Sequence, residues 1–250
     1  MSNKKYYIYG NHSVSSAILN PKRVIHSILV STNYNQDDLL ALLNKNNTTK
    51  HLTKKIRQVS NKELSQILNT TNNHQGIAIL TDELQQIQLN VLIQQLKNKP
   101  KTTLAVLDQV TDPNNIGAIL RSAAAFDIDA LIIPKYNNAQ ENSSIAKSAS
   151  GALEVVPLIQ VTNLSNALTT LKQHQFWVAG LDSNANTSNI NNLKDYNRLV
   201  LVFGNEHKGL RTLTKSNCDI IAKIPFMKNK IESLNLSNAA AITFYLRYES

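Results

Sequence analysis

The 250-residue chain has a single cysteine, Cys218, and only 17% of its residues are charged. One cysteine excludes an intramolecular disulfide and leaves no cysteine cluster for zinc or iron–sulfur binding. The six histidines lack the HxxxH spacing of a metal site, so we expect no bound metal. No apolar run approaches the ~20 residues of a membrane-spanning helix, and the N-terminus lacks a signal-peptide stretch. We therefore expect a cytoplasmic protein that does not associate with a membrane.

Glycine is also scarce, and the seven glycines form no G-x-G pair. This absence argues against the phosphate-binding fingerprint of Rossmann folds. The chain contains no G-x-S-x-G, H-E-x-x-H or protein-kinase signature either. Serine hydrolases, zinc peptidases and kinases of those types are therefore excluded.

The positive charge is concentrated at one end of the chain. The net charge is +9, and residues 1–80 hold ten Lys and Arg against three Asp and Glu, which is +7. Residues 81–250 hold sixteen against fourteen, which is +2. A basic module beside a nearly neutral one favours polyanion binding by the first, although solubility alone also accounts for such a charge.

Apolar periodicity predicts an α/β chain in two parts separated by a polar linker at 81–103. Residues 1–80 should contain strands at 6–9, 25–31, 56–59 and 77–80, and helices at 13–19, at 37–43 and after Ser60, whose spacing from Glu63 fits a capping box. Residues 104–250 should contain strands at 104–107, 130–133, 153–159, 176–180, 199–203 and 220–224, and helices near 116–124 and at 144–150, 164–174 and 236–248. This alternation predicts a mainly parallel sheet covered on both faces.

Three polar loops follow predicted strands, where parallel sheets place their sites. The first runs from Asp108 into a helix that Asn115 could cap, with Arg121 one to two turns further on. The second is Gly204 to Leu210; Leu210-Arg211 stands where a P-loop needs Lys-Ser/Thr, so the glycines fit a tight turn against a neutral or cationic ligand. The third holds Ser233, Asn235 and Ser237, of which capping explains one comfortably.

Taken together, these loops resemble the three motifs of the SpoU (TrmH-like) branch of the SPOUT methyltransferases. Residues 112–126 (DPNNIGAILRSAAAF) resemble the first motif and 204–210 (GNEHKGL) the second. The segment from IPF at 224–226 to ESLNLSNAAAITFYLRYE at 232–249 resembles the third, and KSASGALEVVP at 147–157 resembles the stretch between the first two. IYGNHSVSSAILNPKR at 8–23 and HQGIAIL at 74–80 resemble the start and end of an L30e-like RNA substrate-binding domain.

The resemblance implies an S-adenosyl-L-methionine-dependent RNA ribose 2′-O-methyltransferase with a trefoil knot and a homodimeric active site. The members most similar to this chain methylate a guanosine of large-subunit ribosomal RNA. Carried over by position, the residues expected to bind the cofactor are Gly180, Leu181, Gly204, Asn205, Gly209, Ile224 and Leu234. The residues expected in catalysis and substrate binding are Asn115, Arg121, Glu206, Ser233 and Asn235.

Two positions depart from the family pattern. Asp127 stands where the family usually has glycine after the first motif, and residues 226–231 replace a glycine-containing turn, with Asn229 the best substitute for a left-handed residue. The resemblance implies that Arg121 contacts the target phosphate, and the arginine at this position is the base proposed for the family. Since a guanidinium stays protonated, we expect Arg121 mainly to clamp the phosphate, leaving another group or water to accept the proton. Glu206 is a candidate base, and a carboxylate that only fixes the loop is an equally good interpretation of it.

Two alternatives remain open at this point. One is a tRNA ribose methyltransferase with the same catalytic domain, which the L30e-like domain disfavours only by analogy. The other is a non-catalytic RNA-binding ribosome assembly factor, supported only by the altered loop after Pro225.

Overall fold

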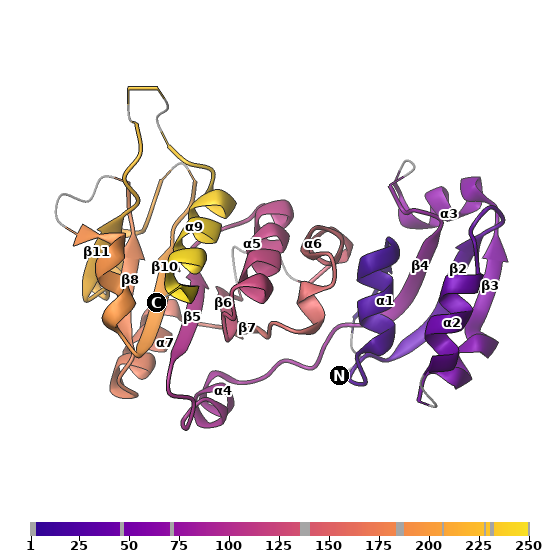
Figure 1. The fold of residues 1–250 in the computed structure, drawn as a ribbon, viewed down its shortest axis with the longest axis horizontal. Helices are drawn as coiled ribbons and strands as arrows, with labels where there is room; N and C mark the ends of the chain where they lie inside the picture. The colour runs from indigo at the N-terminus through magenta and orange to yellow at the C-terminus, as the bar shows by residue number, and fades with distance from the viewer. Residues whose placement is uncertain are drawn as a thin grey trace. The chain divides into compact units, whose positions relative to one another are not determined.

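The computed structural model describes residues 4–45, 48–70, 73–135, 141–183, 188–206, 208–227, 229–230 and 233–249 (Figure 1). The chain forms two compact units. The first comprises residues 1–85 together with 141–155, and the second comprises residues 86–140 and 156–250. No helix in the described ranges is both long and apolar enough to cross a membrane.

The first unit is a four-stranded mixed sheet with helices on its faces. Its strands are β1 (Lys5–Tyr9), β2 (Ile25–Ser31), β3 (Ile56–Val59) and β4 (Ile77–Asp82), in the order β1-β4-β2-β3. Only β2 and β3 pair in parallel. Its helices are α1 (Asn11–Leu19), α2 (Asp37–Lys45), α3 (Asn61–Leu68) and α6 (Ser143–Ala149), with 3₁₀ turns η1 (Lys50–Lys55) and η2 (Ala152–Glu154).

The second unit is a seven-stranded sheet in which every pairing is parallel, in the order β7-β6-β5-β10-β8-β11-β9. Its strands are β5 (Thr102–Leu107), β6 (Ala130–Pro134), β7 (Leu158–Val161), β8 (Trp177–Leu181), β9 (Ser188–Asn189), β10 (Arg198–Phe203) and β11 (Ile220–Lys223). Its helices are α4 (Leu89–Gln95), α5 (Pro113–Ala125), α7 (Leu164–Gln173), α8 (Thr212–Ser216) and α9 (Leu236–Tyr248), with a 3₁₀ turn η3 (Ile190–Asp195). The α/β class and the parallel sheet are therefore confirmed.

Both faces of this sheet are buried, which explains its continuously apolar strands. One side of β5 and β10, including Leu104 and Val202, joins a core with apolar residues of α4 and α7. On the other side, the ring of Phe203 meets that of Phe244 of α9 edge to face, with centroids 5.7 Å apart. Helix α9 also packs against α5, so the helix of the first motif lies beside that of the third.

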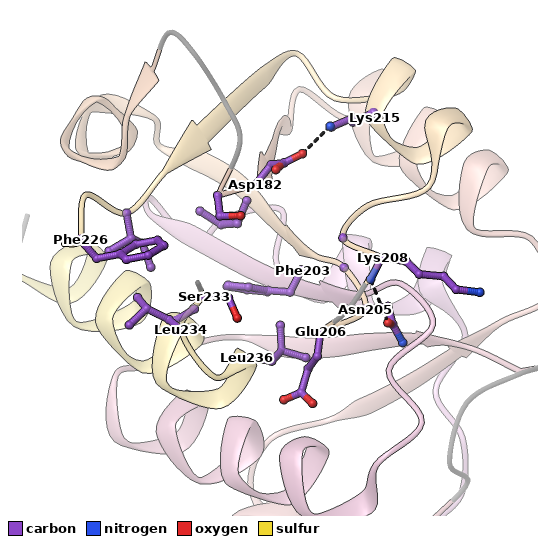
Figure 2. A pocket seen from close by; sticks show the side chains of 16 residues that line it. Asp182, Phe203, Asn205, Glu206, Lys208, Lys215, Phe226, Ser233, Leu234 and Leu236 are labelled. Atoms are coloured by element: carbon purple, nitrogen blue, oxygen red, sulfur yellow. Dashed lines mark hydrogen bonds and ion pairs between the residues drawn. The ribbon is translucent and has the colours of Figure 1, made fainter. Parts of the chain in front are cut away.

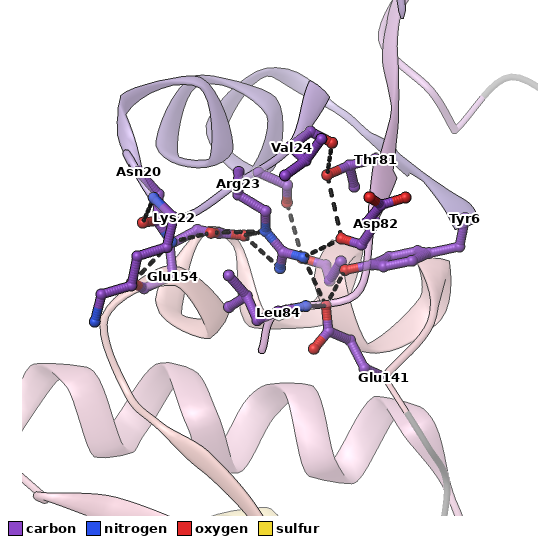
Figure 3. A network of polar contacts seen from close by, with 12 residues as sticks. Tyr6, Asn20, Lys22, Arg23, Val24, Thr81, Asp82, Leu84, Glu141 and Glu154 are labelled. Atoms are coloured by element: carbon purple, nitrogen blue, oxygen red, sulfur yellow. Dashed lines mark hydrogen bonds and ion pairs between the residues drawn. The ribbon is translucent and has the colours of Figure 1, made fainter. Parts of the chain in front are cut away.

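A buried ionic network holds residues 141–155 within the first unit (Figure 3). The Arg23 guanidinium donates to Glu141 at 2.7 Å and to both oxygens of Glu154 at 2.8–3.0 Å. The hydroxyl of Tyr6 donates to the same Glu141 oxygen at 2.6 Å, and burial raises the pKa of this tyrosine. Since the side chain of Arg23 has no exposed surface, removing either partner would leave a buried charge without compensation.

Most elements match the sequence prediction. Helix α8 and strand β9 were not predicted, and two predictions are wrong. The strand expected at 153–159 is wrong: residues 152–154 form η2, and β7 begins only at Leu158. Gly151, at φ +94°, turns the chain into η2, and Pro157 has no N–H for a strand ladder. The cap expected of Asn115 is also wrong, because Asp112 accepts from Asn114 N at 3.0 Å and Pro113 is the first helical residue.

Candidate active site

A cavity of about 450 Å³ opens at the carboxyl ends of β8, β10 and β11 (Figure 2). This volume falls within the roughly 300–1,000 Å³ typical of small-molecule sites. The start of α9 completes its wall. The lining residues are Leu181, Asp182, Ser183, Phe203, Gly204, Asn205, Glu206, Lys208, Gly209, Lys215, Ile224, Phe226, Ser233, Leu234, Leu236 and Ala239.

The loop after β10 closes on itself through its two glycines. Asn205 and Gly209 exchange backbone hydrogen bonds of 3.0 and 2.8 Å. A Cβ atom at Gly204 would lie 2.3 Å from the carbonyl carbon of Gly209, so only glycine fits there. Gly209 has φ +66° and open space around it, so its requirement is conformational. The tight turn expected from this loop is thus formed.

The three motifs meet at one carboxylate. Glu206 Oε1 accepts hydrogen bonds from Asn115 Nδ2 and from Asn235 Nδ2, both at 2.9 Å. Asn235 Nδ2 also lies 3.3 Å from Asn115 Oδ1. Asn115 comes from α5, Glu206 from the loop after β10, and Asn235 from the start of α9, so tertiary structure joins residues that are 91 and 29 positions apart in the sequence.

Asn235 also caps α9. Its Oδ1 accepts from Ser237 N at 2.9 Å and from Asn238 N at 3.4 Å, while its Nδ2 serves Glu206. Ser237 Oγ donates to the same Oδ1 at 2.6 Å. The capping interpretation of Asn235 is therefore confirmed, and the same side chain contacts Glu206, whereas its role in the site stays a prediction.

Eight of the twelve residues predicted for the site line the cavity. They are Leu181, Gly204, Asn205, Glu206, Gly209, Ile224, Ser233 and Leu234. Asn115 and Asn235 reach it through Glu206.

Gly180 and Arg121 lie apart from this group. A Cβ at Gly180 would meet Leu210 Cδ1 at 2.7 Å and Cys218 Sγ at 2.9 Å, so this glycine is required by packing within β8. Arg121 is exposed on α5 and does not line the cavity. The six residues from Asn115 to Arg121 correspond to about 9 Å along an α-helix and about 120° around it, so the two side chains point in different directions.

Several lining residues were not singled out from the sequence. Lys215 of α8 pairs with Asp182, and α8 itself was not predicted because it is only one turn long. Buried Asp108 holds helix α8 in place: its carboxylate accepts a hydrogen bond from Thr214 Oγ1 at 2.6 Å and pairs with Arg211, the residue before the helix, at 2.6 Å. Asp108 directly follows strand β5 and begins the first polar loop, so its position at a strand end could have marked it as a residue of the site region.

The departures from the family pattern have different outcomes. Asp127 has φ +52°, the left-handed conformation that glycine adopts most readily, and its carboxylate lies 3.0 Å from Lys99 Nζ. Aspartate is among the few other residues that tolerate this conformation. Of the altered turn, Lys228, Ile231 and Glu232 lie outside the described residues, so the left-handed role of Asn229 stays a prediction.

Behind the cavity wall, Cys218 is a packing residue. Its thiol donates to Thr214 O at 3.2 Å, and burial, reinforced by Asp219, raises its pKa to about 12. A protonated thiol is a poor nucleophile. In the described part of the chain, no group of three or more His, Cys, Asp and Glu side chains could hold a metal ion.

The chemistry of the wall suits a ligand with an apolar ring and a cationic centre. Phe203, Phe226 and Leu234 supply apolar surface, and Figure 2 shows them around the cavity. The lining holds two carboxylates and two lysines: Lys215 pairs with Asp182, and Glu206 and Lys208 are the other two charged groups. Glu206 is the carboxylate that could face a cationic centre. S-adenosylmethionine, which joins an adenine ring to a sulfonium, meets both requirements.

Comparison with known proteins identifies the family. The SpoU rRNA methylase family model matches residues 102–245, and the model for RNA 2′-O ribose methyltransferase substrate binding matches residues 7–87. The chain is 37% identical over 247 residues to the 23S rRNA (guanosine-2′-O-)-methyltransferase RlmB of Vibrio parahaemolyticus, covering 98% of this chain and 96% of that protein. It is 34% identical over 242 residues to a Staphylococcus epidermidis protein assigned to the TrmH family of tRNA/rRNA methyltransferases, covering 96% and 94%.

Solved structures share the fold. The SpoU methyltransferase AviRb from Streptomyces viridochromogenes, in complex with AdoMet, aligns with a TM-score of 0.76 at 18% identity over 98% of this chain and 90% of that chain. An AdoMet-bound rRNA methyltransferase from Sinorhizobium meliloti aligns with a TM-score of 0.76 at 20% identity over 98% and 87%.

The family matches define an S-adenosylmethionine-dependent RNA 2′-O-methyltransferase. The chain belongs to the SpoU methyltransferase family, as its three motifs predicted.

Proposed function

We propose that this protein transfers a methyl group from S-adenosylmethionine to the ribose 2′-oxygen of a guanosine in large-subunit ribosomal RNA. The meeting of Asn115, Glu206 and Asn235 beside a cavity that suits the cofactor carries the proposal. The guanosine and the ribosomal RNA come from the relative in Vibrio parahaemolyticus, whose name specifies both. An enzyme with this substrate acts in the cytoplasm.

The cofactor residues are proposed to be Leu181, Gly204, Asn205, Gly209, Ile224 and Leu234, with Gly180 supporting them from within β8. When bound, S-adenosylmethionine supplies an electrophilic methyl group. The closed turn from Gly204 to Gly209 lets the backbone approach the ligand closely, since neither position carries a side chain. Phe226 and Leu234 exclude water from one side of the cavity.

Glu206 and its two asparagines are proposed to organise the substrate side. Both amide donors bond to Oε1, which leaves Oε2 for a substrate hydroxyl. Ser233 is exposed at the cavity rim and offers a further donor or acceptor to the ribose. A 2′-hydroxyl must lose its proton near the transition state, and a carboxylate held within hydrogen-bond reach is suited to accept it.

Arg121 is proposed to act from a second copy of the chain. It points away from Asn115 on its own helix, and the family resemblance implies a homodimer with the active site at the interface. Exposed aromatic residues of α9 support such an interface: Tyr245 and Tyr248 are 46% and 61% exposed and lie about Phe126, with ring centroids 5.8 and 6.1 Å away. An exposed apolar cluster of this kind marks an interaction surface.

Subunit complementation tests this arrangement. The Arg121→Ala and Asn235→Ala variants should each be inactive. Random mixing puts half of the dimers in the mixed form with one intact site each, so about a quarter of wild-type activity should return. If Arg121 acts within its own chain, each site in the mixed dimer carries one defect and no activity returns.

The N-terminal part, residues 1–80, is proposed as the RNA substrate-binding domain of L30e type, with 81–103 a linker and 104–250 the catalytic domain with a trefoil knot. Its charge of +7 and the substrate-binding family match over 7–87 support this role.

Transfer of labelled methyl to undermodified ribosomal RNA and to tRNA, followed by nuclease digestion, tests the whole proposal. Label in ribosomal RNA as 2′-O-methylguanosine is the expected result. Label only in tRNA would overturn the substrate while keeping the chemistry. A folded protein that transfers no label to either RNA would refute the catalytic proposal.

A further inference from the structure

A second concave surface lies at the opposite edge of the large sheet from the cofactor cavity. It is a groove of about 780 Å³ at the amino ends of β8 and β10, where Trp177 and Arg198 begin those strands. Strand β8 runs from Trp177 at the groove to Leu181 at the cavity, four steps of about 3.3 Å each. The two sites are therefore separated by the length of strand β8, and the proposed chemistry does not use the groove.

An indole lies open in this groove. Trp177 is the only tryptophan of the chain and is 48% exposed. Its ring lies 5.0 Å from that of Tyr196, tilted by 42°. Aromatic rings left exposed in a hollow present a flat apolar face that water solvates poorly, and such surfaces mark binding sites.

The polar groups around the indole favour a nucleotide over an apolar ligand. Lys97, Lys99 and Arg198 line the groove, against one carboxylate, Asp195. Lys99 is engaged by Asp129 at 2.7 Å. Arg198 stacks on Phe176 with its guanidinium carbon 4.1 Å from the ring centroid and donates through Nη1 to Leu96 O at 3.3 Å, while its Nε is buried. Lys97 is therefore the cation of the groove best placed to meet a phosphate.

Side-chain amides complete the lining, contributed by Gln94, Gln173, Gln175 and Asn197. Amides offer both donors and acceptors, which matches the hydrogen-bonding edges of a nucleobase. Stacking on an aromatic face, amide contacts to base edges and cations for phosphate are the features by which proteins hold unpaired nucleotides.

We propose that this groove binds an unpaired nucleotide of the RNA substrate, with its base stacked on Trp177 and its phosphate beside Lys97. The inference rests on the proposed function in one respect, which is that the substrate is RNA. It adds a contact site distant from the methyl-transfer site. A base in a duplex cannot present its face to the indole, so the groove selects single-stranded RNA.

Tryptophan fluorescence reports this groove alone, because Trp177 is the single tryptophan. Titration with an adenine-rich, single-stranded 12-nucleotide RNA should quench the emission saturably, whereas the same sequence as a duplex should not. S-adenosylmethionine alone should leave the emission unchanged. Saturating RNA binding, measured by the anisotropy of labelled RNA, without any change in Trp177 emission would overturn the proposal.

Variants separate stacking from charge. Trp177→Ala should weaken binding of the labelled single strand about tenfold, and Trp177→Phe should retain most of the affinity because the ring remains. Lys97→Ala should lower the slope of log affinity against log salt by about 1. Val91→Ala, which removes an exposed apolar side chain of α4 outside the groove lining, should bind as wild type.

The groove and the catalytic proposal can fail independently. Trp177→Ala should raise KM for RNA and leave kcat and cofactor affinity unchanged. Quenching by RNA in a protein that transfers no methyl group would refute the proposed function and support the groove. Normal affinity of a folded Trp177→Ala variant for the single strand would refute the groove, whatever the methylation assay shows.

Discussion

Replacing Gly204 by alanine should open the turn that forms one wall of the cofactor cavity. The added Cβ would lie 2.3 Å from Gly209 C, 2.4 Å from Gly209 O and 2.4 Å from Leu210 N. Carbon atoms in contact are normally about 3.5–4.0 Å apart, so the backbone must move by roughly 1 Å or more. That shift breaks the two hydrogen bonds between Asn205 and Gly209, at about 1 kcal/mol each. A loss of about 2 kcal/mol corresponds to about 30-fold weaker binding of a ligand that needs the closed turn.

Isothermal titration with S-adenosylmethionine measures this change, and thermal unfolding shows whether the fold survives. Gly209→Ala separates the two requirements for glycine in this turn: its added Cβ would meet open space, so its expected cost of about 1–2 kcal/mol comes from backbone strain at φ +66° and not from a clash. Gly209→Asn should cost less, since asparagine tolerates this conformation. Binding by Gly204→Ala within twofold of wild type, with an unchanged melting temperature, would refute the steric reasoning.

Three further changes have defined outcomes. Asn115→Asp places a second carboxylate against Glu206. The methyl-transfer rate of the variant relative to wild type should therefore fall at pH 8 and recover at lower pH, where the two carboxylates share a proton. If the ratio of the two rates does not change with pH, the contact between positions 115 and 206 is contradicted. Arg23→Ala leaves Glu141 and Glu154 buried without their cation and should lower the free energy of unfolding in urea by about 3–5 kcal/mol, with Arg23→Lys intermediate; a loss below about 1 kcal/mol would contradict the network. Cys218, with its pKa raised to about 12, should react with a disulfide reagent at pH 8 only after unfolding, and rapid labelling of the native protein would show that the thiol is accessible. Because its folded pKa exceeds the unfolded value of 9.0, its contribution to stability should be present below about pH 9 and lost between about pH 9 and pH 12.

Local patterns determined most of the secondary structure. The strand at 25–31 and the helix at 236–248 have the predicted bounds, because each apolar run ends where a polar or turn-forming residue begins. Ser60 accepts from Glu63 N at 3.1 Å, as its spacing predicted. The strand expected at 153–159 was wrong because the same apolar residues serve a 3₁₀ turn as well as a strand. Apolarity alone does not distinguish the two, and Val155 is 70% exposed.

The sequence by itself determined the family, the α/β class and the residue types of the site, because these depend on motifs and on short-range periodicity. Only the tertiary structure decided that Glu206 joins Asn115 to Asn235 and that Trp177 opens into a groove at the amino ends of β8 and β10. The physical reason is that a strand order of β7-β6-β5-β10-β8-β11-β9 brings distant loops together by pairings between strands. Such pairings depend on hydrogen bonds and buried faces shared between segments far apart in the chain, and no single segment carries that information.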